Sequence, residues 1–371
     1  MARRVVVAGT RFGRVYLSAF RGGSFDFELA GILARGSERS LACARHYGVP
    51  LFREPEELPE DIDIVCVVVG TAVNGGDGCE IAQRLMRRGI SVLQEHPLHP
   101  DELAACLRTA KEAGVAYRVN AHFAHLRPVR RFVALAEALR ARQPVLFVDA
   151  LASMQTLYTL LDIIGRLLGG LRPSAFEAAP APSERLVALA KTPQPFRGLH
   201  GVIAGVPVSL RIQNEIDPAE PDNYTHFFHR IAIGTEAGTL TLINTHGPVV
   251  WSPRAHMPAD SQNRVFYEAS PADHLDFPTC TGIGAGEAPS FREILAKTWP
   301  EGIRQALEEF GRAVDIREDP LAAGQYHLAL ANLWRDVTTR IAPVRIMRGT
   351  APDILPAEAI AAAAERRPIK T

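Results

Sequence analysis

The stretch Val5-Val6-Val7-Ala8-Gly9-Thr10-Arg11-Phe12-Gly13 joins a β-branched run to a turn of small residues near the start of the chain. Consecutive β-branched residues are typical of a buried parallel strand. Small residues in the following turn let backbone N–H groups approach a pyrophosphate at a helix N-terminus. The usual spacing is G-x-G-x-x-G, and here Ala8 and Thr10 replace the first two glycines. The position of the turn, between a first strand and a first helix, therefore carries the prediction of a Rossmann turn.

Strand and helix patterns alternate outward from this turn to about residue 125. Apolar runs predict strands at 27–33, 64–69, 91–93 and 115–119, and helical patterns lie at 13–20, 37–47, 79–88 and from Pro100 onward. This alternation predicts a parallel sheet with right-handed crossovers. We therefore expect an α/β protein in which residues 1–125 form a doubly wound, NADP-binding Rossmann domain.

Residues 126–371 have a different pattern, in which short strands are separated by Gly, Pro, Asn and Asp. One hairpin is expected across Gly205-Val206-Pro207 and another across residues 234–238. Residues 223–229 are strand-like, and alternation would place Tyr224, His226 and Phe228 on one face and Thr225, Phe227 and His229 on the other. One of these faces would line a substrate cleft, or both would take part in ordinary sheet packing. A further strand is expected at 144–150, and helices at 156–168, 291–314, 326–341 and 357–366. The pattern predicts an α+β domain with a mostly antiparallel sheet.

Composition narrows the class of protein. The 371 residues are 47% hydrophobic and 22% charged, and 41 Lys and Arg balance 41 Asp and Glu. This balance predicts neither a nucleic-acid nor a membrane partner. No apolar run approaches the roughly 20 residues that span a bilayer, and the first residues lack the apolar region of a signal peptide. Five scattered cysteines without a C-x-x-C pair predict no disulfide framework and no metal site. We expect a cytoplasmic enzyme.

The end of the second strand predicts which dinucleotide binds. The sequence there is Leu33-Ala34-Arg35-Gly36-Ser37-Glu38-Arg39-Ser40, with no acid at the strand end. Arg35, Ser37 and Arg39 can gather around a 2′-phosphate, so NADPH is the predicted cofactor, although a solvated basic loop would have the same composition. The predicted cofactor contacts are Gly9, Thr10, Arg11, Phe12, Gly13, Arg35, Ser37, Arg39, Gly70, Thr71, Glu95 and His96.

A histidine follows the strand at residues 91–93, in Leu93-Gln94-Glu95-His96-Pro97-Leu98-His99-Pro100. The carboxyl ends of the strands in a doubly wound sheet face the ligand crevice. An imidazole there can donate a proton near neutral pH because its unperturbed pKa lies close by. His96 is therefore either a catalytic acid or a loop histidine flanked by prolines.

Together these residues resemble the Gfo/Idh/MocA oxidoreductase superfamily, in which a Rossmann domain precedes an α+β domain with an open sheet. The superfamily motif E-K-P corresponds to Glu95-His96-Pro97, where histidine replaces lysine. The resemblance is closer to the thiazolinyl imine reductase branch, which acts in siderophore biosynthesis of the yersiniabactin and pyochelin type. It is carried by Gly9-Thr10-Arg11-Phe12-Gly13-Arg14-Val15-Tyr16-Leu17-Ser18, Gln94-Glu95-His96-Pro97-Leu98-His99-Pro100, Thr245-His246-Gly247-Pro248 and Trp251-Ser252-Pro253-Arg254.

The resemblance implies NADPH-dependent reduction of a thiazoline C=N to a thiazolidine. The substrate would be a thioester on the carrier protein of a nonribosomal peptide synthetase. Hydride attack on the imine carbon places negative charge on nitrogen, which His96, or a water that it holds, would protonate. The implied catalytic residues are His96, Glu95 and His125, with His122 as a substitute. Phe123 matches the position of a tyrosine in some relatives, which implies that no phenol is the acid.

Two alternatives remain open. The first is an NADP-dependent sugar or cyclitol dehydrogenase of the same superfamily, against which stand His96 and Arg166, four residues after Asp162, where dehydrogenases have histidine. The second is a non-catalytic NADP-binding sensor. The resemblance also implies a homodimer formed through the sheet of residues 126–371. Metal binding by His226 and His229 is not expected because no third ligand is near.

Overall fold

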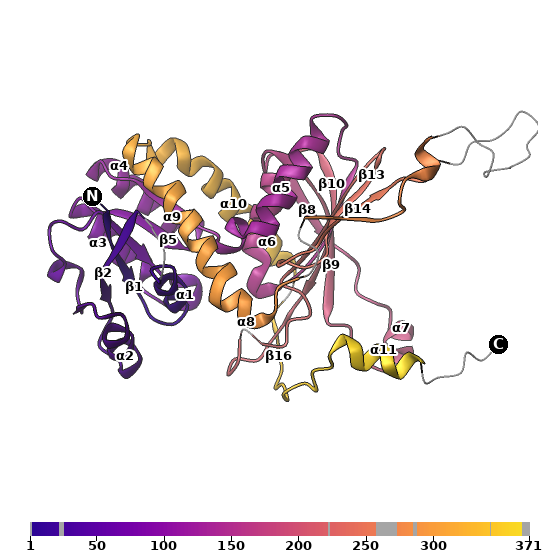
Figure 1. The fold of residues 1–371 in the computed structure, drawn as a ribbon, viewed down its shortest axis with the longest axis horizontal. Coiled ribbons are helices and arrows are strands. Elements are labelled where there is room, and N and C mark those ends of the chain that lie inside the picture. The colour runs from indigo at the N-terminus through magenta and orange to yellow at the C-terminus, as the bar shows by residue number, and fades with distance from the viewer. Residues whose placement is uncertain are drawn as a thin grey trace, which may run out of the picture.

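The computed structural model describes residues 2–21, 26–221, 223–256, 273–284, 288–341 and 343–365. Two sheets organise this part of the chain, and helices from the C-terminal third lie between them (Figure 1). The α/β class, the parallel first sheet and the mostly antiparallel second sheet are confirmed.

The first sheet has six parallel strands in the order β3-β2-β1-β4-β5-β6. Its strands are β1 (Arg3–Ala8), β2 (Phe27–Leu33), β3 (Leu51–Phe52), β4 (Ile64–Val67), β5 (Ser91–Glu95) and β6 (Tyr117–Asn120). The order reverses between β1 and β4, which is the switch point where doubly wound sheets bind ligands. The edge strand β3 was not predicted, because two residues show no periodicity.

Helices cover both faces of this sheet. One face packs against α3 (Gly78–Arg87) and α4 (Pro100–Ala113). The other packs against α1 (Gly13–Ser18), α2 (Glu38–Tyr47) and, from far along the chain, α9 (Trp299–Asp315). Ile303, Leu307 and Phe310 of α9 are almost fully buried and join the core formed by β1, β4 and β5.

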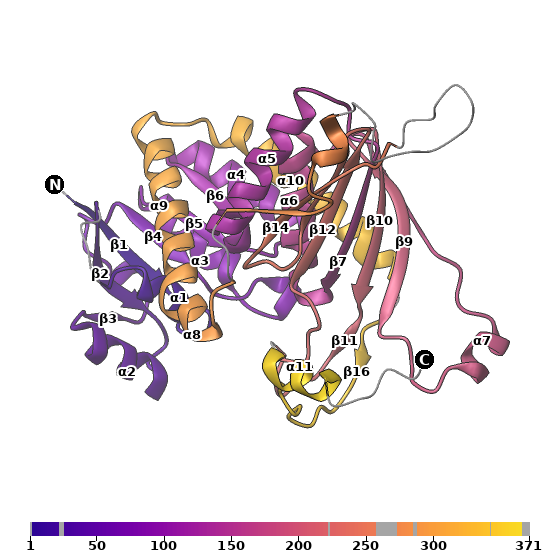
Figure 2. The same cartoon turned by 45° about the vertical axis from the view of Figure 1, so that its right-hand side comes forward.

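The second sheet has eight strands in the order β15-β14-β13-β12-β7-β10-β9-β8, and only the β7–β10 pair is parallel. Helices α5 (Arg127–Arg140) and α6 (Leu157–Leu168) cover one face, while no described helix crosses the middle of the other (Figures 1 and 2). The strands are β7 (Phe147–Ser153), β8 (Ser174–Ala178), β9 (Phe196–Ile203), β10 (Val206–Gln213), β12 (His229–Thr235), β13 (Gly238–Leu242), β14 (Val249–Pro253) and β15 (Thr281–Ile283).

Two details of the second sheet correct the sequence-based expectations. The first hairpin turns at Ala204 and Gly205, both with positive φ, and Val206 and Pro207 already belong to β10. Residues 223–228 form no strand, since the Gln213 side chain donates to the Tyr224 carbonyl and accepts from the His226 N–H, both at 2.9 Å. These bonds replace strand pairing, so the predicted alternation of side chains does not apply.

The remaining elements connect and extend the two halves. Helix α10 packs against α4 and α6, and α9 contacts α1. The helix predicted at 291–314 is confirmed as α8, a π-helical turn and α9 in succession. No helix in the described part of the chain is long and apolar enough to span a bilayer. These elements are α7 (Glu184–Leu189), α8 (Phe291–Glu293), α10 (Pro320–Arg340), α11 (Ala357–Glu365) and the small β11 (Glu215–Ile216) and β16 (Arg345–Ile346) pair.

Candidate active site

The turn after β1 has the backbone geometry that a dinucleotide requires. Gly9 adopts φ +95°, and a Cβ at this position would lie 2.4 Å from the Val68 carbonyl oxygen, so only glycine fits. Among the described residues, no partner is found for the backbone N–H groups of Arg11, Phe12 and Gly13. Such unpaired N–H groups at the start of α1 can receive phosphate oxygens. The residues present therefore fit the pyrophosphate of a dinucleotide.

The side chains of the predicted turn point to different surroundings. Thr10 is buried, whereas Arg11 is exposed. The Phe12 ring packs edge-on against His122, with centroids 5.8 Å apart, and tilts against Trp299 at 6.2 Å. Phe12 thus joins the cofactor turn to η3 (His122–His125) and to the start of α9.

The basic residues at the end of β2 lie beside this turn. Arg39 Nε donates to Thr10 Oγ1 at 3.5 Å, while Arg35 remains exposed to solvent. Ser37 caps α2, where its hydroxyl accepts a hydrogen bond from the Ser40 N–H at 3.3 Å. Sequence reasoning missed Arg53, whose guanidinium lies 3.4 Å from the position of a Cβ on Gly36. The structure therefore adds one arginine to the three predicted residues.

The loops after β4 and β5 are tied together. Thr71 is almost fully buried and its hydroxyl donates to the Pro97 carbonyl oxygen at 2.7 Å. The Gly70 carbonyl accepts from the Gly78 N–H at 2.9 Å, which closes the loop in front of α3. Thr71 thus holds the segment that follows His96, whereas Gly70 closes its own loop.

Glu95 ends β5 in a nearly buried position, with 11% of its side chain exposed. Its Oε2 accepts a hydrogen bond from the Tyr16 hydroxyl, and Asn120 Nδ2 donates to the same hydroxyl at 2.5 Å. Its Oε1 lies 3.3 Å from His96 Nε2. Burial raises the pKa of Glu95 to about 8, although the Tyr16 hydrogen bond opposes this rise. The protonated form of Glu95 therefore predominates at neutral pH.

His96 is equally buried and stacks on Tyr158 of α6, with ring centroids 4.9 Å apart and planes 2° from parallel. Its Nδ1 has no hydrogen-bond partner within the described chain, and neither does the Tyr158 hydroxyl. Burial lowers the pKa of His96 to about 4, while Asp162 opposes the shift. The expectation that His96 titrates near neutral pH is therefore wrong: the imidazole is neutral there and donates only as an N–H group.

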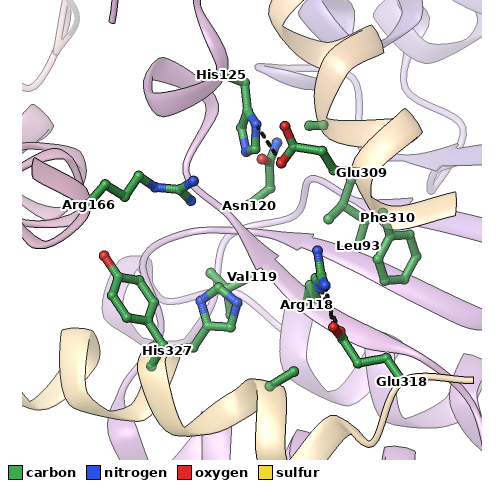
Figure 3. Close-up of a pocket in the computed structure, with 13 residues that line it drawn as sticks. Leu93, Arg118, Val119, Asn120, His125, Arg166, Glu309, Phe310, Glu318 and His327 are labelled. Carbon is green, nitrogen blue, oxygen red and sulfur yellow. Dashed lines mark hydrogen bonds and ion pairs between the residues drawn. The ribbon is translucent and has the colours of Figure 1, made fainter. Parts of the chain in front are cut away.

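The histidines of η3 lie elsewhere. His125 Nδ1 is 3.5 Å from Glu309 Oε2, and both residues line a cavity of about 330 Å³ that is also bounded by Asn120 and Arg166 (Figure 3). No described contact joins His125 to Glu95 or His96. His122 is fully buried, with Nε2 3.2 Å from the Trp299 carbonyl oxygen, and burial lowers its pKa to about 3. The structure brings Glu95 and His96 together but not His125.

The carboxylate of Asp162 has two side-chain partners. Arg166 Nε donates to its Oδ2 at 3.0 Å, and the Tyr326 hydroxyl donates to Oδ1 at 2.9 Å. Its carboxylate is therefore engaged on both oxygens. The observation agrees with the incomplete Asp–His pair predicted from Arg166.

Sequence reasoning missed Tyr16, Asn120 and Tyr158. That no phenol is the acid stays a prediction: Phe123 packs among Phe228, His229 and Trp299, and the phenol of Tyr158 lies beside His96. One signal could have found Tyr158: it is four residues from Asp162, so the two share a face of α6. Tyr16 and Asn120 have no comparable local signal.

His229 serves the structure of the second sheet. Its Nε2 lies 2.7 Å from Thr159 Oγ1 and its Nδ1 lies 2.9 Å from Thr245 Oγ1, in a fully buried position. No group of three or more potential metal ligands is found among the described residues.

Comparisons with solved structures place this site in a known fold. An oxidoreductase from Agrobacterium radiobacter in complex with NAD+, L-tartaric acid and magnesium has a TM-score of 0.64 at 12% identity, covering 92% of this chain and 96% of that one. A 3-ketoreductase from Actinomadura kijaniata in complex with TDP-benzene and NADP has a TM-score of 0.61 at 16% identity, covering 94% and 100%. The UDP-N-acetylglucosamine 3-dehydrogenase from Acidithiobacillus ferrooxidans has a TM-score of 0.61 at 16% identity, covering 92% and 100%. At these identities the likeness shows the fold alone.

Family models match both halves of the chain. Residues 3–121 match the Gfo/Idh/MocA oxidoreductase family, NAD-binding Rossmann fold. Residues 143–252 match the model described as thiazolinyl imine reductase Irp3-like, C-terminal. A comparison with curated proteins gives no significant match. The N-terminal part of the chain therefore matches the Rossmann domain of the Gfo/Idh/MocA oxidoreductase family, and the C-terminal part matches the C-terminal domain of thiazolinyl imine reductases.

Proposed function

We propose that this oxidoreductase uses NADPH to reduce the C=N bond of a thiazoline to a thiazolidine. One observation carries the proposal: a neutral imidazole, His96, replaces the lysine of the E-K-P motif, and its Nδ1 has no partner among the residues that the structure describes. The chain combines this histidine with the C-terminal domain of a thiazolinyl imine reductase. An imine nitrogen that accepts a proton from an uncharged donor suits such a site.

The preference for NADPH rests on charge at the end of β2. Arg35, Arg39 and Arg53 surround Gly36 and the first turn of α2, and β2 ends in Leu33 rather than in an acid. Guanidinium groups form charge-assisted hydrogen bonds with phosphate oxygens. When bound, NADPH supplies the hydride. The turn of Gly9 to Gly13 would hold its pyrophosphate, and the three arginines with Ser37 would hold its 2′-phosphate.

Residues of the protein supply the proton that must be added to the imine nitrogen when the hydride is transferred. Negative charge that grows on the imine nitrogen is neutralised by the N–H of His96, which Tyr158 holds by stacking. Glu95, beside Nε2, fixes the imidazole so that Nδ1 carries its proton. A positioned acid of this kind accelerates a reaction by about 10²- to 10⁴-fold.

The proposed substrate is an intermediate of siderophore assembly, presented as a thioester by the carrier protein of a nonribosomal peptide synthetase. The proposed assembly is a homodimer through the face of the eight-stranded sheet that helices leave uncovered (Figure 2). Both proposals extend the match to the thiazolinyl imine reductase domain.

The test is loss of NADPH absorbance with a synthetic bis-heterocyclic thiazoline thioester. Parallel reactions contain NADH in place of NADPH, and a panel of sugars and cyclitols with NADP+. Rapid oxidation with the thiazoline alone is the expected result. Activity only with a sugar or cyclitol would make the enzyme a dehydrogenase, and tight NADPH binding without any turnover would make it a sensor.

A further inference from the structure

Glu95 lies at the centre of a series of polar side chains from three elements and the loop after β5. Asn120 of β6 donates to the Tyr16 hydroxyl of α1, and that hydroxyl donates to Glu95 Oε2. The other carboxyl oxygen lies 3.3 Å from His96 Nε2, and no described residue is a hydrogen-bond partner of His96 Nδ1. This hydrogen-bonded series therefore starts at Asn120 and ends at His96 Nδ1, the atom proposed to donate to the imine.

The surroundings of Glu95 make it the group that changes charge in this cluster. The titratable groups that face it are Tyr16 on α1, Cys66 on β4, His96, and Tyr158 on α6. Burial raises the pKa of both tyrosines and of the Cys66 thiol, so these three stay protonated. His96 stays neutral because burial lowers its pKa to about 4. Asp162 faces His96 and Tyr158 but is paired with Arg166.

We propose that Glu95 stores the proton that His96 delivers, and that Tyr16 and Asn120 are positioning residues that set how readily Glu95 releases it. The proposal rests on the imine reduction proposed above. The imine nitrogen takes the Nδ1 proton of His96, while the carboxyl proton of Glu95 moves to Nε2. His96 ends neutral with the opposite tautomer, Glu95 ends as a carboxylate, and the electron pair is that of the hydride. After product leaves, Nδ1 takes a proton from solvent while the Nε2 proton moves back to Glu95, which restores both the carboxylic acid and the first tautomer.

Tyr16 controls this release because it donates to the carboxylate form. The hydrogen bond from Tyr16 lowers the pKa of Glu95 against the effect of burial. Asn120 in turn donates to the Tyr16 oxygen, which makes the phenol a better donor. Asn120 lines the 330 Å³ cavity, and its Oδ1, which has no partner among the described residues, can accept a hydrogen bond from water there. Removal of Tyr16 or Asn120 should therefore make Glu95 a weaker acid.

The first readout needs no substrate. Infrared difference spectra of the full-length protein, titrated with base, should show a buried carboxylic acid that Glu95→Gln removes. Tyr16→Phe should shift its titration upward by about one to two pH units, the equivalent of one hydrogen bond to a charged group. Asn120→Ala should shift it in the same direction by less. The control Tyr117→Phe removes another buried hydroxyl, which donates to Gln94 at 2.8 Å, and should leave the band in place.

The second readout is the pH profile of thiazoline reduction. The alkaline limb should follow the infrared titration, and Tyr16→Phe should lower kcat near pH 7 by about threefold to tenfold while moving this limb upward. A Tyr16→Phe protein whose band and limb stay with those of the Tyr117→Phe control would overturn the proposal. A shifted band in an enzyme that reduces no thiazoline would instead overturn the proposed function and support the assignment of Tyr16.

Discussion

At the end of β2, Arg35, Arg39 and Arg53 lie in solvent, whereas at the end of β5 Glu95 and His96 keep only 11% of their side-chain surface exposed. The arginines keep their charge whatever surrounds them, so they recognise a ligand by their number and position. Glu95 and His96 take their protonation from burial and from one or two partners. A substitution among the arginines should therefore alter cofactor binding, whereas a substitution of Glu95 or His96 should alter turnover.

The largest expected effect is that of His96→Gln. Glutamine keeps a polar side chain but cannot pass a proton from one side to the other, so turnover should fall by about 10²- to 10⁴-fold. The affinity for NADPH, measured by fluorescence titration, should stay within about twofold because the arginines are untouched. His46→Gln on the exposed surface of α2 is the control. Unchanged turnover in His96→Gln would remove His96 from the mechanism.

A smaller effect is expected at the exposed group. The double variant Arg39→Ala, Arg53→Ala should weaken NADPH binding by about 10- to 100-fold, the loss of one to two hydrogen bonds to a charged group. NADH binding should not change, and the effect should shrink at high salt because these charges are screened. The matched control is Arg45→Ala, on the same helix but in its last turn. A double variant that still prefers NADPH would show that the 2′-phosphate lies elsewhere.

The smallest effect is expected for Tyr158→Phe. Phenylalanine preserves the ring that stacks on His96 and removes only a hydroxyl that has no partner in the described part of the chain. Turnover with the thiazoline should therefore fall by less than about tenfold if the imidazole is the donor. The measurement is kcat for Tyr158→Phe beside His96→Gln. A loss of 100-fold or more, with His96→Gln nearly active, would move the acid role to the phenol.

The same contrast explains what the sequence could predict. Local periodicity was sufficient for the order of strands and helices in residues 3–120, apart from the edge strand β3, and the end of a predicted strand was sufficient to single out Gly9, Glu95 and His96. The partners of these residues come from other elements: Tyr16 from α1, Asn120 from β6, and Tyr158 from α6. Such contacts depend on how elements pack, which no local pattern contains.

Two misses have a more specific physical origin. Histidine has an unperturbed pKa near neutrality, so the sequence alone predicts that His96 titrates near neutral pH. Its burial, which lowers the pKa to about 4, is known only from the structure. The segment 223–228 resembles a strand because it is rich in aromatic residues, until the side chain of Gln213 is seen to take the hydrogen bonds that a neighbouring strand would offer. Both corrections come from the three-dimensional environment.

Helix α9 imposes an order of events on the synthesis of this chain. The parallel sheet is complete in sequence at Asn120, yet one of its faces is covered by residues up to Asp315. At about 5–20 residues per second, a ribosome needs roughly 10 to 40 seconds to make the intervening chain. During that time the apolar side chains that will meet Ile303, Leu307 and Phe310 lack their cover. The first layer to be synthesised is finished by one of the last helices, which makes it the layer most exposed to aggregation or chaperone binding in the nascent protein.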